Sequence, residues 1–316
     1  MTTNRPARRP ARMLAVGRFF GVPIYFAPSW LIIAALLTIY YAPIIRDAST
    51  TVSSSTAYVL AFAFAVLFAG CVLGHELGHT AVSVALGLPV RRVVIFLLGG
   101  VSEIERDPDR PRDEFLVAAA GPAVSLLLAA AAAGAHQFVA PRSMPGVLLA
   151  LLLWSNLVVA IFNLLPGLPL DGGRLLRAGV WAIGRSRHTG TKAAAWIGRA
   201  LAVLIAVSGL VAERSSVGYS AGLFSIAVAA YLWFGAGQSL RIGEMLERLP
   251  DINLSQLLRP GLLLHPDLSV AEALRRGPGR AMPVDWYWWT PASDHEPSWT
   301  RPRLARSHPN AGHGQP

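Results

Sequence analysis

The feature that most constrains this chain is the gathering of its apolar residues into long, nearly uncharged stretches. Of its 316 residues, 53% are hydrophobic and 15% are charged, whereas soluble domains average about 25% charged residues. A bilayer core requires roughly 20 mostly apolar residues per helix. Six stretches approach or exceed this length, at about 22–43, 57–86, 114–135, 146–170, 194–211 and 219–239. We therefore expect an all-α polytopic membrane protein with about six transmembrane helices.

Lys and Arg are distributed unevenly over the segments that join these stretches. Of the 28 basic residues, 25 lie in alternate segments, which include both terminal tails. By the positive-inside rule, this bias predicts a multi-pass protein with both termini in the cytoplasm. The same alternation accounts for the net charge of +10, because the basic residues form no patch interleaved with aromatic residues. Nucleic-acid binding is therefore not expected.

The second stretch contains ionisable residues, which are costly at membrane depth and are therefore functional candidates. They form the motif H-E-x-x-H at His75, Glu76 and His79. On a helix, His75 and His79 project from one face and can bind one zinc ion, with Glu76 beside it as general base. The alternative is a set of hydrogen bonds between helices that stabilises the bundle.

A catalytic zinc ion of this kind needs a third protein ligand. Pro166 and Pro169 interrupt the fourth stretch, and a broken helix at membrane depth is tolerated only where it faces protein or a water-filled cavity. Asp171 lies beside this break and is an acceptable zinc ligand, while Asn163 could donate hydrogen bonds to a substrate. Alternatively, Asn163 caps a helix and Asp171 begins a simple turn.

The two motifs together resemble the site-2 protease family of intramembrane zinc metalloproteases. That family has H-E-x-x-H in one transmembrane helix and N-x-x-P-x-x-x-x-D-G about ninety residues later. This chain has the first motif at residues 75–79 and the second at Asn163, Pro166, Asp171 and Gly172. The resemblance covers about residues 15–240.

The resemblance implies one zinc ion per chain, bound by His75, His79 and Asp171. It also implies that Glu76 is the catalytic acid and base and that Asn163 positions the substrate strand. The implied activity is cleavage of single-span membrane proteins in the bilayer of a bacterial cell, including membrane-bound transcriptional regulators. The alternatives are a catalytically inactive scaffold, a metal transporter, or a membrane-anchored zincin with a soluble catalytic domain.

Two further stretches resemble parts of the same family. Gly99 and Gly100 follow the first motif as the family's membrane-associated β-hairpin or edge strand does, and residues 114–122 resemble its third core helix. Residues 93–97 are β-prone and too short to span a bilayer. We expect them to offer an exposed edge to an unwound substrate.

These patterns divide the chain into four parts. Residues 1–18 form a basic cytoplasmic tail, and residues 19–240 form the six-span metalloprotease domain. Residues 251–276 resemble the beginning of a CBS domain, a module that can bind adenine nucleotides, but the chain does not continue that pattern. Residues 277–316 lack helical or strand periodicity, so we expect an irregular tail.

Overall fold

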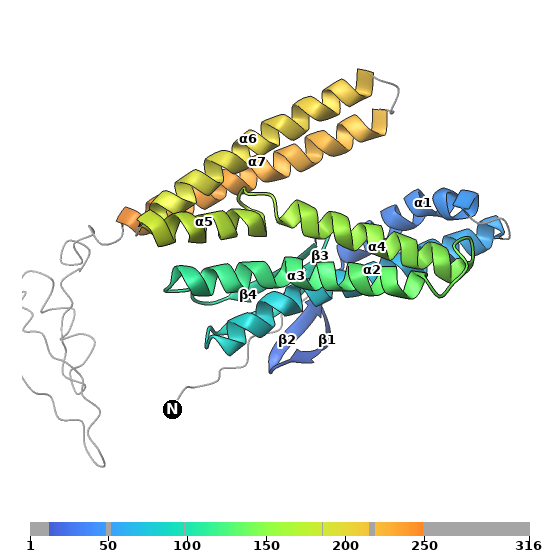
Figure 1. Cartoon of the computed structure of the whole chain (residues 1–316), viewed down its shortest axis with the longest axis horizontal. Helices are drawn as coiled ribbons and strands as arrows, with labels where there is room; N and C mark the ends of the chain where they lie inside the picture. The colour runs from blue at the N-terminus through green and yellow to red at the C-terminus, as the bar shows by residue number, and fades with distance from the viewer. Residues whose placement is uncertain (1–12, 49–51, 98, 185, 215–218, 249–316) are drawn as a thin grey trace, which may run out of the picture. The chain divides into compact units, whose positions relative to one another are not determined.

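The computed structural model describes residues 13–48, 52–97, 99–184, 186–214 and 219–248 (Figure 1). These residues belong to the first of two units of the chain, Met1–Leu249. The CBS-like fragment at 251–276 and the tail at 277–316 lie outside the described residues, so their predictions stay predictions.

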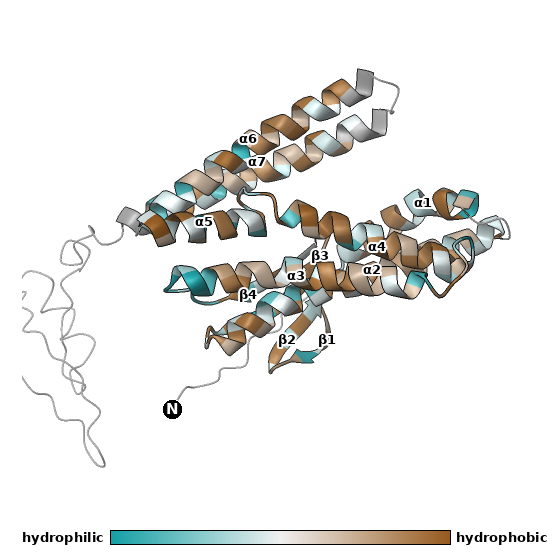
Figure 2. Cartoon of the chain, in the orientation of Figure 1, coloured by the Kyte–Doolittle hydropathy of each residue, from teal (hydrophilic) through white to brown (hydrophobic). Residues whose placement is uncertain are grey.

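Five helices among the described residues are long and apolar enough to cross a membrane. They are α1 (Trp30–Ala48), α2 (Ser54–Ala85), α3 (Pro111–His136), α4 (Met144–Asn163) and α6 (Arg187–Arg214). Large apolar side chains remain exposed along them, as expected for surfaces that face lipid. Figure 2 shows hydrophobic residues along the length of these helices. The expected all-α membrane fold is therefore confirmed.

A sixth long helix, α7 (Tyr219–Arg248), packs along α6 but is not among these five. The count of six transmembrane helices and the cytoplasmic position of both termini stay predictions.

The first expected stretch was placed wrongly at its beginning. Residues 22–26 form strand β2 (Val22–Phe26), which pairs with β1 (Leu14–Phe19), and α1 begins only at Trp30. A turn with positive φ at Phe20 and Gly21 joins the two strands. Because hydropathy does not distinguish a buried β-strand from the beginning of a membrane helix, the apolar run concealed this boundary.

The predicted β-hairpin after the second helix is present as β3 (Val90–Phe96) and β4 (Gly99–Ile104). The four strands form one sheet in the order β1-β2-β3-β4, in which β3 pairs parallel with β2 and antiparallel with β4. The prediction that residues 93–97 form an exposed edge is therefore wrong, because β3 is paired on both sides. The edge of this sheet that contacts α2 is β4 instead.

Helix α3 packs against α2, α4 and the short helix α5 (Asp171–Gly184). The fourth stretch ends as a helix at Asn163, because Pro166 and Pro169 prevent its continuation, and α5 begins after this break. This arrangement brings α2 and α5 to the same helix from segments far apart in the sequence.

Candidate metal centre

Helix α2 carries a short buried polar face in an otherwise apolar helix of 32 residues. His75, Glu76 and His79 are each less than 9% exposed. A spacing of four residues places the two imidazoles one above the other on one side of the helix. The local geometry of α2 is therefore sufficient to bring the two rings together.

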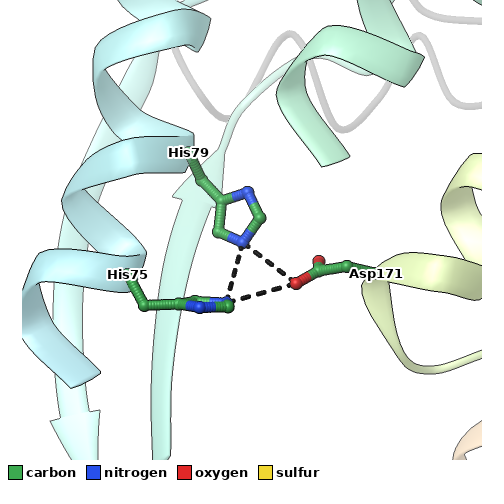
Figure 3. A group of neighbouring side chains, drawn as sticks. All are labelled: His75, His79 and Asp171. Atoms are coloured by element: carbon green, nitrogen blue, oxygen red, sulfur yellow. Dashed lines mark hydrogen bonds and ion pairs between the residues drawn. The ribbon is translucent and has the colours of Figure 1, made fainter. Parts of the chain in front are cut away.

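Asp171 is positioned beside the two histidines by contacts between separate helices. The interrupted segment before it is fixed to α6, where the backbone N–H of the buried Leu168 donates to the carbonyl of Ala194 at 3.1 Å. Asp171 then begins α5, and its carboxylate faces the two histidines (Figure 3). Its Oδ2 lies 3.2 Å from Nε2 of both His75 and His79.

The three facing atoms form an almost equilateral triangle. The two Nε2 atoms are 3.2 Å apart, as far from each other as each is from the Asp171 oxygen. A tetrahedral zinc ion with bonds of about 2.0 Å has neighbouring ligand atoms about 3.3 Å apart. The group therefore has the spacing of three corners of such a coordination shell, and it is a group that could hold a metal ion.

Helix α3 orients both imidazole rings. His79 Nδ1 donates to the carbonyl of Val117 at 2.7 Å, which leaves its Nε2 as the metal-facing atom. His75 Nδ1 lies 2.9 Å from the hydroxyl of the buried Ser125. Hydrogen bonds of this kind to the second ring nitrogen are usual around metal-binding histidines, because they fix the tautomer and the ring plane.

The face of α3 between these contacts has no side chain at Gly121. A methyl group at this position would overlap Nε2 of both histidines. Gly121 therefore leaves open the space into which the two ring nitrogens point. The spacing of the ligand atoms, the orientation of the rings and this open space all fit a metal ion.

Glu76 lies next to this group on α2 and is oriented by the sheet. The hydroxyl of Ser102 on β4 donates to Glu76 Oε2 at 2.8 Å and lies 3.2 Å from Thr80 Oγ1. A side chain at Gly100, on the same strand, would overlap the Glu76 side chain. The strand therefore packs directly on the carboxylate.

The structure brings His75, His79 and Asp171 together, with Glu76 on the same helix as the histidines. Asn163 is in the last turn of α4, where its Nδ2 donates to the carbonyl of Val159 at 3.0 Å. Its proposed role with substrate stays a prediction.

Sequence reasoning missed three contributors, namely Ser102, Ser125 and the Val117 carbonyl. The small polar residue at 125 lies on the same face of α3 as Gly121, four residues away, and that spacing was the available signal.

The fold and the site together define an integral membrane protein with a His-His-Asp group that could bind a metal ion, and with a glutamate on the same helix as the two histidines. The chain belongs to peptidase family M50, the site-2 protease family of metalloproteases. The family model Peptidase family M50 matches residues 63–141 and 140–207, which include both sequence motifs.

Related proteins agree with this assignment. A Synechocystis protein, named as a candidate zinc metalloprotease, is 33% identical over 266 residues, which cover 82% of this chain and 68% of that protein. A zinc metalloprotease of Methanocaldococcus jannaschii is 32% identical over 201 residues, with 63% and 56% of the two chains covered.

One solved structure, a site-2 protease from Methanocaldococcus jannaschii, is 26% identical with a TM-score of 0.49, and the match covers 72% of this chain and 95% of that one.

Proposed function

We propose that this protein is a zinc-dependent intramembrane endopeptidase that cleaves the transmembrane segments of single-span membrane proteins. The observation that carries the proposal is the triangle of His75, His79 and Asp171, with sides of 3.2 Å, on and beside a helix of membrane length. Such a ligand set leaves a fourth position for water or substrate, which is typical of catalytic zinc sites.

When bound, zinc supplies an activated water and polarises the scissile carbonyl. The residues of the chain perform the remaining work. His75, His79 and Asp171 hold the ion. Glu76 accepts a proton from the attacking water and donates it to the departing amine nitrogen. Because Glu76 is buried and fixed by Ser102, its carboxylate is oriented before substrate arrives.

The sheet suggests how a substrate is presented. A transmembrane helix must be unwound before its amide bonds can be hydrolysed, since the helix shields them. Among the strands of the described residues, β4 pairs with β3 alone. Its other edge could therefore pair with an extended peptide, and strand addition is a common mode of peptide recognition. Ser102 of this strand touches Glu76, so a peptide paired with β4 would lie close to the catalytic carboxylate.

The substrates we propose are single-span membrane proteins, including membrane-bound transcriptional regulators, in a bacterial cell membrane. In this proposal Asn163 helps to place the substrate strand. An inactive scaffold would be expected to lack one of the four central residues, and this chain has all four. A metal transporter would be expected to distribute ligands over more helices. In the part of the chain that the structure describes, one His-His-Asp group is found.

The proposal is tested by comparing cells that express the wild-type protein with cells that express Glu76→Gln. Quantitative proteomics would score fragments of single-span membrane proteins. We expect fragments cut within a transmembrane segment only in wild-type cells, because the amide that replaces the carboxylate would not transfer a proton. Zinc content of both purified proteins serves as the control. Identical fragments with zinc bound in both proteins would support the scaffold instead.

A further inference from the structure

One face of α3 serves both halves of the metal centre. Glu114, Val117, Gly121 and Ser125 are spaced by three, four and four residues, so they lie on a single side of the helix. All four are buried. Val117 and Ser125 orient the two histidines, and Gly121 leaves the space between them open. Glu114, the fourth member, contacts the helix that carries the aspartate.

Glu114 is a fully buried carboxylate in the first turn of α3, with an exposed fraction of 0%. Its Oε1 accepts hydrogen bonds from Nε of Arg177, at 2.7 Å, and from Nη2 of the same side chain. Arg187, at the beginning of α6, lies 3.6 Å from the other carboxylate oxygen. Two cations from two helices therefore converge on one buried anion.

Arg177 is on α5, six residues after Asp171. Helix α5 has 14 residues, and six residues of an α-helix span about 9 Å. A rigid helix of this length transmits a displacement at Arg177 directly to its first residue. The ion pair between Glu114 and Arg177 thus fixes α5 on the same helix that orients the histidines.

We propose that the Glu114–Arg177 ion pair is a positioning device for the third metal ligand. It sets the place of the Asp171 carboxylate relative to the two imidazoles, through α5. This inference rests on the proposed function in so far as the His-His-Asp group binds zinc. Metal–ligand distances are restricted to within about 0.2 Å, so a small shift of α5 weakens binding.

A purely structural role for Glu114 makes a different prediction. A pair that only stabilises the fold would affect zinc binding whether or not Asp171 is a ligand. A pair that positions Asp171 affects zinc binding only while the Asp171 carboxylate is present. The two possibilities are separated by a double-mutant cycle between Glu114 and Asp171.

The experiment measures the zinc dissociation constant of the full-length protein in detergent, by competition with a chromophoric chelator. The four proteins are wild type, Glu114→Gln, Asp171→Asn and the double variant. We expect Glu114→Gln to weaken zinc binding by about tenfold, the lower end of the loss caused by removing a direct partner of a ligand, because Glu114 acts on Asp171 only through Arg177 and α5. In the Asp171→Asn background, the same substitution is expected to change the dissociation constant by no more than about twofold, which is the usual deviation from additivity for independent sites.

A matched control breaks a different ion pair. Arg92 donates to Glu103 at 2.7 Å between β3 and β4, and neither residue belongs to α5. Glu103→Gln is therefore expected to leave the zinc affinity unchanged. Cobalt substitution gives a second readout, since the visible spectrum reports on tetrahedral geometry. We expect the tetrahedral bands to weaken in Glu114→Gln and not in Glu103→Gln.

If Glu114→Gln fails to fold, Glu114→Met combined with Arg177→Met replaces the pair without leaving either of these charges buried and unpaired. The same loss of zinc affinity is expected. Equal losses with and without the Asp171 carboxylate, or no loss at all, would overturn the positioning role while leaving the protease intact. A wild-type protein that binds no zinc would instead refute the proposed function and the inference that rests on it.

Discussion

The two histidines and the aspartate of the candidate metal centre differ in how the chain brings them into place. His75 and His79 stand on one uninterrupted helix, and a spacing of four residues alone brings their rings together. Asp171 follows an interrupted segment and is brought to the histidines only because α5 packs on α3 and the preceding segment is fixed to α6. One half is therefore encoded locally and the other by tertiary packing. Substitution of a histidine should therefore affect metal binding without disturbing the packing of other helices, whereas the position of Asp171 should depend on residues that pack α5.

The largest expected effect comes from removing the local half. His79→Ala removes a ligand atom and is expected to weaken zinc binding by more than the roughly 10–100-fold that loss of a supporting partner causes. Because Ala has the highest helix propensity and the rest of this helix of 32 residues is unchanged, α2 itself should persist. Zinc content after dialysis, measured by atomic emission, checks this prediction. His136→Ala, on α3 and outside the His-His-Asp group, is the matched control and should retain zinc.

The next effect is expected at Gly121, which leaves open the space beside Nε2 of both histidines. Gly121→Ala places a methyl group against both metal-facing nitrogens and is expected to prevent zinc binding. The intrinsic helix propensity of α3 should not fall, because Ala is more favourable than Gly in a helix by about 1 kcal/mol. Overpacking against the two buried rings costs about 1–3 kcal/mol, so a modest net loss of thermal stability is expected. Zinc content and thermal stability in detergent measure the two outcomes. Gly134→Ala, in the same helix with open space around it, should leave zinc unchanged. Full zinc occupancy in Gly121→Ala would contradict the placement of the ion.

The same division explains how much the sequence could predict. The histidines and Glu76 were predictable, because one helical motif contains them. Asp171 could be named by its residue type and by a family resemblance, but its distance from the histidines could not be derived, because 96 residues separate it from His75. Ser102 and Glu114 were missed as contributors, since a hydrogen bond to Glu76 and an ion pair with Arg177 arise only when separate segments pack.

The errors in the fold have the same physical origin. The helix interiors were predicted from composition, because an uncharged apolar run of about 20 residues has few stable conformations other than a transmembrane helix. The strand at residues 22–26 and the burial of β3 between two partners depend on pairing with distant strands. Local patterns do not contain that information, so the beginning of the first helix and the choice of sheet edge were both wrong.

A smaller effect is expected at the carboxylate beside the ligands. Ser102→Ala removes the hydrogen bond to Glu76 and is expected to lower the rate of cleavage by about tenfold, a part of the 10²–10⁴-fold that a general base contributes. Zinc affinity should be unchanged, because Ser102 contacts neither histidine ring in the observed hydrogen bonds. Ser102→Thr keeps the hydroxyl and should restore the rate.

Thr80→Val is the control for this prediction, since it removes the contact between the hydroxyls of Thr80 and Ser102. The contacts of Ser102 with the carboxylate and the backbone carbonyl of Glu76 remain. An equal loss of rate in Thr80→Val would mean that Ser102 merely fixes β4 on α2.

The smallest effect is expected at Asp107, the exposed member of the cluster of charged residues Asp107, Glu114, Arg177 and Arg187. Asp107 accepts from Arg187 at 3.0 Å, and its side chain is 60% exposed. The partial desolvation of Asp107 raises its pKa, but the hydrogen bond and charge of Arg187 outweigh this and hold the pKa below its ordinary value. A lowered folded-state pKa gives stability that is present above the unfolded pKa, about 4, and is lost as the pH falls below it. Solvent screening limits this contribution to less than about 1 kcal/mol.

Asp107→Asn should therefore lower thermal stability slightly at pH 7 and remove a small part of its decline in acid, as differential scanning fluorimetry in detergent would measure. Zinc affinity should not change, because Arg187 stands on α6 and Asp107 precedes α3, so neither belongs to the helix that carries Asp171. A loss of zinc affinity in Asp107→Asn as large as that in Glu114→Gln would show that the whole cluster acts on the metal centre. The distinction between a pair that positions α5 and a pair that only joins neighbouring segments would then fail.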